Sequence, residues 1–270
     1  MKYETFEPHP DLEALVKFYW TLEVPYDPNN QKQKIIPDGC IEMTFNFRDG
    51  IKRYISDDEY VVHPRSMVMG QRTKSYFIEP VGHVDSFAIC FYPHGFANFV
   101  NTPLKDLVDM EVPVKDLFGA VRSDELEEKM IQATDAQQRI KIIEDFLLKI
   151  LHDSTTIENI VKTTVDALIT SKGTSSINTI LKDDLAKRRK LERNFKKQIG
   201  ISPKQLGKVI RLHTALKMLL NKNENLTSIA YESEYFDQAH FIKDFKEFTG
   251  VTPKEFVGDE SMTLASLFYK

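Results

Sequence analysis

The amino-acid sequence predicts an α+β fold, in which an N-terminal β-barrel or jelly-roll domain precedes an all-α domain with two helix-turn-helix units joined by a long helix. Three observations favour this fold. Short β-rich runs bounded by Pro and Gly fill the first hundred residues, and helical spacing of apolar residues replaces them after Pro103. A sixteen-residue pattern also occurs twice in the last third. The length of 270 residues is typical of two domains.

The composition excludes several classes of protein. A net charge of −4, with 41% hydrophobic and 28% charged residues, is typical of an ordinary soluble globular protein. The first twenty residues lack the pattern of a signal peptide, and no run of 18 apolar residues occurs, so we expect a cytoplasmic protein without membrane contact. Cys40 and Cys90 stand alone in apolar stretches, without metal-ligand spacing, and are expected to be buried thiols.

Strands are predicted between residues 12 and 100. The stretch "CIEMTFNF" alternates Ile41, Met43 and Phe45 with polar residues, as expected of a half-buried antiparallel strand. The stretches "YVVHPRSMVMG", "KSYFIEPVG" and "SFAICFYP" are further candidates. An initial helix is expected over residues 11–20. Several short strands separated by turns indicate a barrel or jelly roll.

Helices are predicted after this β-rich part. Residues 124–152 carry apolar residues at helical spacing, with Ser123 as the expected N-cap. This region either packs the two domains together or forms a dimer contact. A second helix is expected to end at Gly173. The predicted domains are residues 1–152 and 153–258, followed by a tail, 259–270.

The sixteen-residue pattern recurs at a distance of 50 residues. Residues 191–206, "LERNFKKQIGISPKQL", align with residues 241–256, "FIKDFKEFTGVTPKEF", with five identical pairs. Each copy reads as an amphipathic helix, a C-terminal Gly, and a helix that starts at Ser/Thr-Pro. A short helical stretch precedes each copy. The sequence therefore predicts helix-turn-helix units at about 174–200 and 224–250.

The two units carry opposite charge. Residues 182–222 hold 13 basic and 3 acidic residues, net +10, whereas residues 223–257 hold 3 basic and 7 acidic residues, net −4. In the first unit Leu191, Phe195 and Ile199 fall on one face and the basic residues on the other. A solvated face usually mixes signs, so this face predicts insertion into a DNA major groove. The connecting helix, about 20 residues or about 30 Å, would place the two recognition helices about one DNA turn apart.

These stretches closely resemble the DNA-binding domain of AraC/XylS-type transcription regulators. "RKLERNFKKQIGISPKQLGKVIRLHTALKML" and "LTSIAYESEYFDQAHFIKDFKEFTGVTPKEF" carry the resemblance, which covers about residues 157–257. Residues 1–152 resemble, less specifically, a cupin-like domain through "YW", "IPDGCIEMTFNF" and "FYPHGFANFV". The resemblance implies a one-component regulator whose N-terminal domain senses an effector or mediates association.

The resemblance also implies roles for individual residues. The base-reading positions of the first unit fall on Arg189, Glu192 and Arg193, whose side chains suit guanine and cytosine edges. Those of the second unit fall on Gln238, Ala239, Ile242 and Lys243. The expected contacts to the DNA backbone are Arg188, Lys190, Lys196, Lys197 and Lys204.

Two positions depart from the family pattern. Lys187 replaces the usual small residue before the first recognition helix, in a turn, "KDDLAK", that lacks Gly. In the second turn Glu234 replaces the customary Gly, which would cost about 1 kcal/mol in a left-handed conformation. We therefore expect this turn to be shifted or longer. The negative net charge of the second unit predicts that it contributes less affinity than the first.

Other functions have less support in the sequence. His63, His83 and His94 lack metal-ligand spacing, and no catalytic motif occurs, so neither an enzyme nor a cofactor or metal is expected. Trp20, Phe45 and Phe91 are candidates for an effector pocket. The expected partners are double-stranded DNA, a small effector, RNA polymerase and a second copy of the chain. The rival hypothesis is a ligand-binding or metal-dependent barrel whose helix-turn-helix serves protein contacts.

Overall fold

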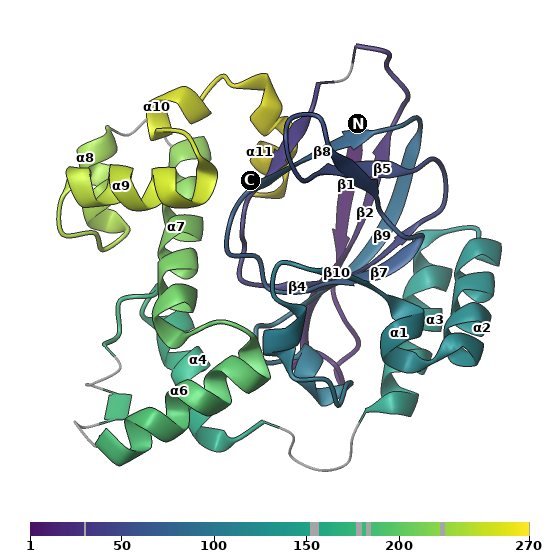
Figure 1. The fold of residues 1–270 in the computed structure, drawn as a ribbon, viewed down its shortest axis with the longest axis horizontal. Coiled ribbons are helices and arrows are strands. Elements are labelled where there is room, and N and C mark those ends of the chain that lie inside the picture. The colour runs from purple at the N-terminus through teal and green to yellow at the C-terminus, as the bar shows by residue number, and fades with distance from the viewer. Residues whose placement is uncertain (30, 152–156, 177–179, 182–184, 222–224, 270) are drawn as a thin grey trace.

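The computed structural model describes residues 1–29, 31–151, 157–176, 180–181, 185–221 and 225–269. Its N-terminal part is built from two antiparallel sheets that face each other (Figure 1). The six-stranded sheet has the order β1 (Lys2–Phe6), β2 (Val16–Val24), β9 (Val84–Phe91), β4 (Ile41–Asn46), β7 (Ser66–Met69) and β10 (Glu111–Pro113). The four-stranded sheet has the order β3 (Gln33–Ile35), β8 (Tyr76–Pro80), β5 (Ile51–Tyr54) and β6 (Tyr60–Val62). The expected jelly-roll or barrel character is confirmed.

The expected initial helix over residues 11–20 is wrong. Residues 10–15 form turns, and strand β2 begins at Val16. The run "VKFYWTLEV" is rich in aromatic and β-branched residues, which pack well on a pleated surface. Pairing with both β1 and β9 completes the backbone hydrogen bonds of this strand, so tertiary pairing decides its conformation.

Strand β4 shows the predicted alternation, but its polar face has a different environment from the one expected. Ile41, Met43 and Phe45 are buried in the core behind the six-stranded sheet. Glu42, Thr44 and Asn46 point the other way, toward the space between the two sheets, and Thr44 and Asn46 are also buried. The polar face of this strand therefore lines an interior cavity instead of facing bulk water.

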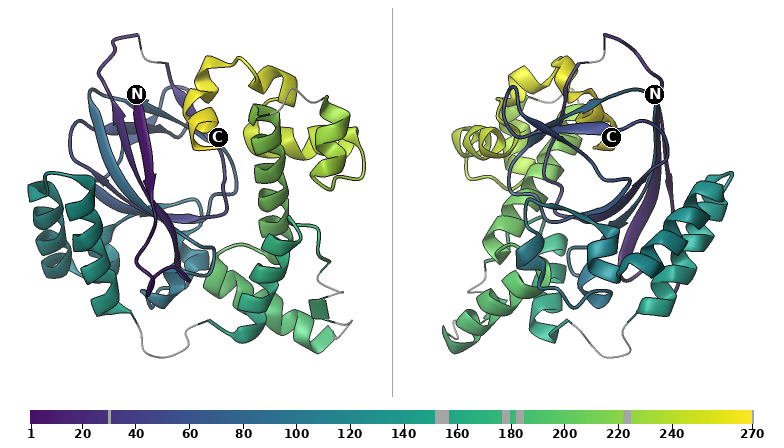
Figure 2. Two further views of the ribbon diagram at one scale, coloured as in Figure 1. Left: turned by 180° about the vertical axis from the view of Figure 1, so that it is seen from behind. Right: turned by 45° about the vertical axis from the view of Figure 1, so that its right-hand side comes forward.

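Three helices cover the outer face of the six-stranded sheet: α1 (Val114–Phe118), α2 (Ala120–Gln132) and α3 (Ala136–Ile150). They lie on the side of the sheet away from the C-terminal helices (Figures 1 and 2), so they do not pack the two domains together. Asp135 caps α3 by accepting from the backbone N–H of Gln138. Ser123 is buried inside α2 and is not its N-cap, because α2 begins at Ala120. A dimer contact through these helices stays a prediction.

The C-terminal part is helical, as predicted. Its helices are α4 (Asn159–Thr170), α6 (Leu185–Ile199), α7 (Pro203–Asn221), α8 (Leu226–Glu232), α9 (Gln238–Thr249) and α10 (Pro253–Phe256). Gly173 follows α4 with φ +82°, as its predicted role requires, and packs against the backbone of Gly207 in α7. Within the first helix and turn of the first unit, residues 177–179 and 182–184 lie outside the described residues. Helix α7 joins the two units, with α6 at one end and α8 and α9 at the other (Figure 1).

The segment expected as a tail has structure of its own. A 3₁₀ turn, Glu260–Met262, leads into α11, Thr263–Phe268, which returns to the N-terminal domain and lies beside the two sheets (Figure 2). Leu264 belongs to the hydrophobic cluster between the sheets, whereas Met262 and Tyr269 belong to the cluster of the second unit. The last residues therefore connect two cores. None of the helices in the described ranges combines the length and apolarity that a membrane crossing requires.

Candidate DNA-binding surface and ligand cavity

Helix α6 presents the predominantly basic face that the sequence predicted. Leu191, Phe195 and Ile199 are fully buried, and they pack in a core shared with the N-terminal domain. The opposite side carries exposed side chains from Arg189 to Lys197. Because the apolar stripe fixes the rotation of the helix, the basic stripe is held toward solvent. The structure places the candidate residues of this unit on an accessible surface.

Two of these candidates form ion pairs within the protein. Arg188 Nε lies 3.2 Å from Glu192 one turn later, and Lys190 Nζ lies 3.0 Å from Glu158 beside the start of α4. Both pairs are exposed and therefore contribute little to stability. They do change the charge that this face presents. Arg188 partly neutralises Glu192, and the pair with Glu158 directs the Lys190 ammonium toward α4.

Most of the basic residues of this unit line a groove. It lies between α6, the segment after α4 and the start of α7, and its polar lining includes Ser175, Ser176 and Ser202. Six basic side chains border it: Arg188, Arg189, Arg193, Lys196, Lys204 and Arg211. Lys190 and Lys197 are not part of this lining and lie on another flank of α6. The groove offers guanidinium and ammonium donors at a concave surface, as an anionic backbone requires.

The corresponding surface of the second unit is less basic. Ala239 and Lys243 of α9 are exposed, Ile242 is half-buried, and Gln238 accepts a hydrogen bond from the Thr227 hydroxyl at 2.9 Å. Lys208 of α7 pairs with two acids of α9, Asp244 at 3.2 Å and Glu247 at 3.0 Å. These contacts fix α9 against α7, and the exposed basic side chains of α9 are Lys243 and Lys246.

The turn of the second unit keeps its shape despite the departure at Glu234. Glu234 has φ +61°, so it adopts the left-handed conformation that glycine favours. Its N–H donates to Tyr231 O at 2.9 Å, and the N–H of Tyr235 donates to Ala230 O at 2.9 Å. The expected shift of the turn is therefore wrong, because surrounding hydrogen bonds hold the unfavourable residue in place.

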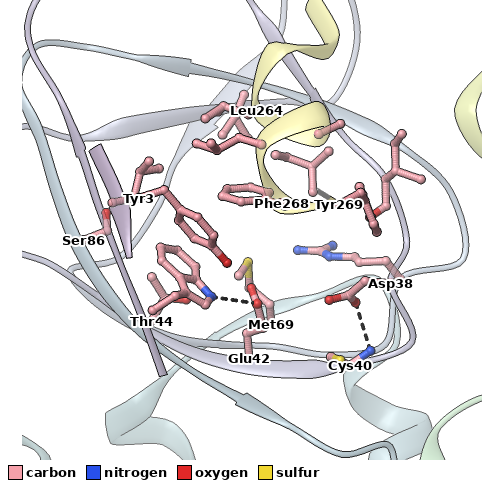
Figure 3. Close-up of a pocket in the computed structure, with 18 of the residues that line it drawn as sticks. Tyr3, Asp38, Cys40, Glu42, Thr44, Met69, Ser86, Leu264, Phe268 and Tyr269 are labelled. Atoms are coloured by element: carbon pink, nitrogen blue, oxygen red, sulfur yellow. Dashed lines mark hydrogen bonds between the residues drawn. The ribbon is translucent and has the colours of Figure 1, made fainter. Parts of the chain in front are cut away.

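A cavity of about 710 Å³ lies between the two sheets (Figure 3). Its walls are apolar side chains of both sheets, including Phe18, Leu22 and Ile78, and its floor is polar. Trp20 lines it, as predicted. Phe45 and Phe91 do not, because they project from the opposite face of the six-stranded sheet into the core behind it. Period-2 alternation separates these two phenylalanines from the pocket to which they were assigned.

Glu42 is the most strongly perturbed acid of the cavity. Its Oε1 accepts from Trp20 Nε1 at 3.0 Å (Figure 3). Burial and the neighbouring Asp38 together raise the pKa of Glu42 to about 8, against the lowering effects of the Trp20 hydrogen bond and of the charges of Lys17 and Arg72. Glu42 is therefore mainly protonated at neutral pH and can donate a hydrogen bond into the cavity.

A second polar cluster closes one side of the cavity. Glu111 accepts from the guanidinium of Arg72 and lies 2.9 Å from Arg53 Nε. Burial, together with these two arginines, lowers the pKa of His63 to about 4, so this histidine is neutral at pH 7. His63 and Arg72 both line the cavity. His63, His83 and His94 do not lie together, because His83 lies beside Glu23 and His94 contacts Ala14 O.

Helix α11 forms part of the cavity wall. The Phe268 ring lies 5.2 Å from that of Tyr3 and 5.8 Å from that of Trp20. The Tyr269 hydroxyl donates to Ile36 O at 3.0 Å, and its ring meets His213 of α7 edge-on at 4.9 Å. The residues beyond the second unit thus touch the cavity and the connecting helix at once.

Known proteins match the two parts of the chain separately. Residues 4–113 match a domain of unknown function (DUF6597), and residues 186–258 match a family described as a helix-turn-helix domain. A stretch of 68 residues, 25% of the chain, is 34% identical to the HTH-type transcriptional regulator ArgR of Pseudomonas aeruginosa and covers 21% of it. The chain thus matches only about a fifth of that relative. The C-terminal part carries an AraC/XylS-type helix-turn-helix domain.

Solved structures of ToxT from Vibrio cholerae are similar over most of the chain. One has 12% identity and a TM-score of 0.48, covering 91% of this chain and 99% of ToxT. Another, of ToxT bound to an unsaturated fatty acid, has 12% identity and a TM-score of 0.43, covering 88% and 93%. Helix α11 follows the matched AraC/XylS-type residues, which end at residue 258.

Several residues of the cavity escaped the sequence analysis. The alternation of β4 places Glu42 on the polar face of a half-buried strand, and the sequence indicates no role for Arg72 or the α11 residues. The alternation "EMTFN" did contain a signal, because a polar face in a strand can line an interior space as well as meet water. Only the position of the second sheet distinguishes the two cases.

Proposed function

We propose that this protein is a cytoplasmic transcription regulator that binds specific double-stranded DNA mainly through its first helix-turn-helix unit. The observation that carries this proposal is the exposed basic face of α6 beside a groove with six cationic side chains. Counterion release by such a surface drives association with DNA. The AraC/XylS-type match supports a regulator over an enzyme.

Within the first unit, we assign different roles to the basic residues. Arg189 and Arg193 are spaced one turn apart on the exposed face and would donate to guanine edges, while Glu192 would accept from cytosine. Lys196 and Lys204 in the groove, and Lys197 on the flank, would contact phosphates. Arg188 and Lys190 would first have to leave Glu192 and Glu158.

The second unit would fix the register on DNA. Helix α7 has 19 residues, which corresponds to about 28 Å at 1.5 Å per residue. This length approaches one turn of B-DNA, about 34 Å, so α6 and α9 could enter successive major grooves. Lys243 would be the main polar reader of α9, since Gln238 is already bonded to Thr227.

The cavity is the proposed effector site. Its volume suits a small molecule, and its apolar walls and polar floor are typical of ligand pockets. An effector there would contact α11, which also touches α7 through Tyr269. Binding would thereby change the relative stability of arrangements that differ in the position of the DNA-binding units. RNA polymerase and a second copy of the chain remain candidate partners.

The test of DNA recognition is selection of sites from a random duplex pool by the full-length protein at two salt concentrations. We expect enriched sites with two motifs about 10 bp apart, and affinity that falls steeply with salt. Enrichment of a single motif would restrict base reading to the first unit. Salt-sensitive binding without enrichment would contradict sequence-specific regulation.

Effector coupling needs a separate experiment. Truncation after residue 258 removes α11 and opens the cavity, and we expect it to change DNA affinity, because a contact with α7 is lost. The full-length Tyr269→Phe variant removes only the hydroxyl that donates to Ile36 O and is the milder control. Unchanged DNA affinity in a folded truncated protein would exclude α11 as the connection.

A further inference from the structure

The fold brings the only two cysteines of the chain together with a carboxylate. Cys40 and Cys90 are 50 residues apart, yet their sulfur atoms and a carboxylate oxygen of Asp38 all lie within 4.8 Å of one another. Pairing of β4 with β9 causes this, because Glu42 lies opposite Cys90 and Cys40 precedes Glu42 by two residues. Cys40 also lines the cavity floor. The sequence spacing contains no sign of this cluster.

The carboxylate is positioned by the backbone. Asp38 Oδ1 accepts from the N–H of Cys40 at 2.9 Å, which directs the side chain back toward the sulfur (Figure 3). Gly39 between them has φ +78°, a conformation that makes this tight return of the chain possible. The cluster is thus built by a turn and a strand pair, and both are held by regular hydrogen bonds.

We propose that Asp38, Cys40 and Cys90 form a binding site for a thiophilic divalent metal ion such as Zn²⁺, with a fourth position open toward the cavity. Thiolate sulfurs select soft or borderline metals, and a carboxylate is a common third ligand. Zn–S bonds of about 2.3 Å place two sulfurs about 3.8 Å apart in a tetrahedron. Small rotations of the side chains would close the cluster to that spacing.

Lys17 supplies the charge balance that such a buried site needs. Its Nζ lies 3.9 Å from Cys40 Sγ, on the cavity floor. Two thiolates and one carboxylate carry −3, a divalent ion reduces this to −1, and the Lys17 ammonium offsets the remainder. A neutral sum lowers the cost of burying these charges.

A disulfide between the two cysteines is less compatible with the register. Cys40 directly precedes β4, whose register places Glu42 opposite Cys90, so the two cysteines are diagonal neighbours. Diagonal neighbours in a sheet typically have Cα atoms about 7–8 Å apart. Disulfides require about 4.4–6.8 Å. A metal ion bridges the longer separation without backbone movement.

Metal binding would also reach the DNA-binding part. A Cβ at Gly39 would lie 3.3 Å from Leu206 and 3.4 Å from Val209, so the turn that carries the ligands abuts α7. Gln71 Nε2 donates to Gly39 O at 2.8 Å and holds the turn from the other side. An ion at the cluster would fix this turn against the connecting helix. This consequence rests on the proposed function, whereas the metal site itself does not.

The site is tested with reduced full-length protein and Co²⁺, which replaces zinc and reports thiolate ligation by a charge-transfer absorption band. We expect one Co²⁺ per chain, displaced by Zn²⁺. Cys40→Ser and Cys90→Ser should weaken binding by about 100-fold or more and remove the band, and Asp38→Asn should weaken it by at least about 10-fold. Asp11→Asn, at an exposed acid of the same domain, is the matched control.

Affinity should rise with pH, because thiol ligands must lose their protons when the metal binds. Circular dichroism identifies variants that fail to fold, and Lys17→Gln then provides a second test, with weaker binding expected. Absence of stoichiometric Co²⁺ binding, or an intact band in Cys90→Ser, would overturn the proposal. Loss of two thiols under mild oxidant, with no metal binding by the reduced form, would indicate a disulfide pair instead. DNA binding is measured in a separate experiment, so failure of the proposed DNA-binding function is distinguishable from failure of the proposed metal site.

Discussion

The two helix-turn-helix units share one sequence pattern and differ in the charge of their surfaces. Phe195 and Phe245 occupy the same position of the repeat, and both are fully buried. The sequence around them carries net charges of opposite sign, +10 over residues 182–222 and −4 over residues 223–257. The repeated positions are therefore those that build the unit, and the divergent ones are those that would meet a partner.

The surroundings of the units differ in the same way. The core of the first unit is continuous with that of the N-terminal domain, whereas the second unit packs with Ile36 and the residues around α11. The first unit packs on the N-terminal domain at the 3₁₀ turn Leu104–Leu107. The second unit contacts that domain through Ile36, through Lys34 Nζ, which donates to Thr249 O at 3.1 Å, and through the C-terminal segment.

The largest expected effect tests the shared architecture. Phe195→Ala and Phe245→Ala each remove a fully buried ring, and each should lower the free energy of unfolding by about 3–5 kcal/mol. Chemical denaturation of the full-length protein measures both. Lys196→Ala, at the exposed position next to Phe195, is the control and should change stability by less than about 0.5 kcal/mol. A small effect of only one phenylalanine substitution would show that the repeat does not extend to the core.

The second prediction contrasts base reading by the two units at equivalent exposed positions. Arg193→Ala should cost about 1–3 kcal/mol of affinity for a selected site and relax specificity at one base position, because a bidentate donor is lost. Lys243→Ala should cost less, because it lies in an acidic unit. Binding titrations with selected and scrambled duplexes measure both. Equal losses on both duplexes for Arg193→Ala would contradict its role as a base reader.

Much of the fold could be predicted from the sequence where one periodicity dominates. Helix α7 was expected as about 20 residues and has 19, and the repeat located α6 and α9. Strand β2 was missed because the spacing of Leu12, Val16, Tyr19 and Trp20 also fits a helix, and its pairing with β1 and β9 is not visible locally. Local pattern decides an element only where tertiary pairing does not compete.

The candidate sites divide in the same way, into one that depends on a local pattern and others that depend on tertiary pairing. The basic face of α6 depends on one helix, so its residues could be assigned from spacing alone. The cavity depends on two sheets and on α11, and the sequence identified Trp20 but placed Phe45 and Phe91 on the wrong face. The proximity of Cys40 to Cys90 depends on strand register, for which the sequence has no local signal.

The third prediction compares Lys196 with Lys246, which are identical in the repeat and both exposed. Lys196→Ala should reduce the slope of log affinity against log salt by about 1, because one phosphate contact and its counterion are lost. Lys246→Ala should change the slope by less, since its unit carries a negative net charge. Titrations at four salt concentrations give both slopes. Equal reductions would mean that the two units contact the DNA backbone equally, despite their charge.

The smallest effect concerns the turn that distinguishes the second unit. Glu234 has φ +61°, a conformation that costs an L-residue about 1 kcal/mol. Glu234→Gly removes this cost but increases the entropy of the unfolded chain, so we expect a net gain of about 0.5 kcal/mol and a higher melting temperature. Glu232→Gly, at the end of α8, should instead destabilise by about 0.5–1 kcal/mol, because there the helical conformation suits glutamate better than glycine. Equal destabilisation by both substitutions would show that the Glu234 side chain contributes more than its backbone strain costs. A gain in stability with unchanged DNA affinity would instead show that the strained turn serves neither the fold nor DNA binding in the second unit.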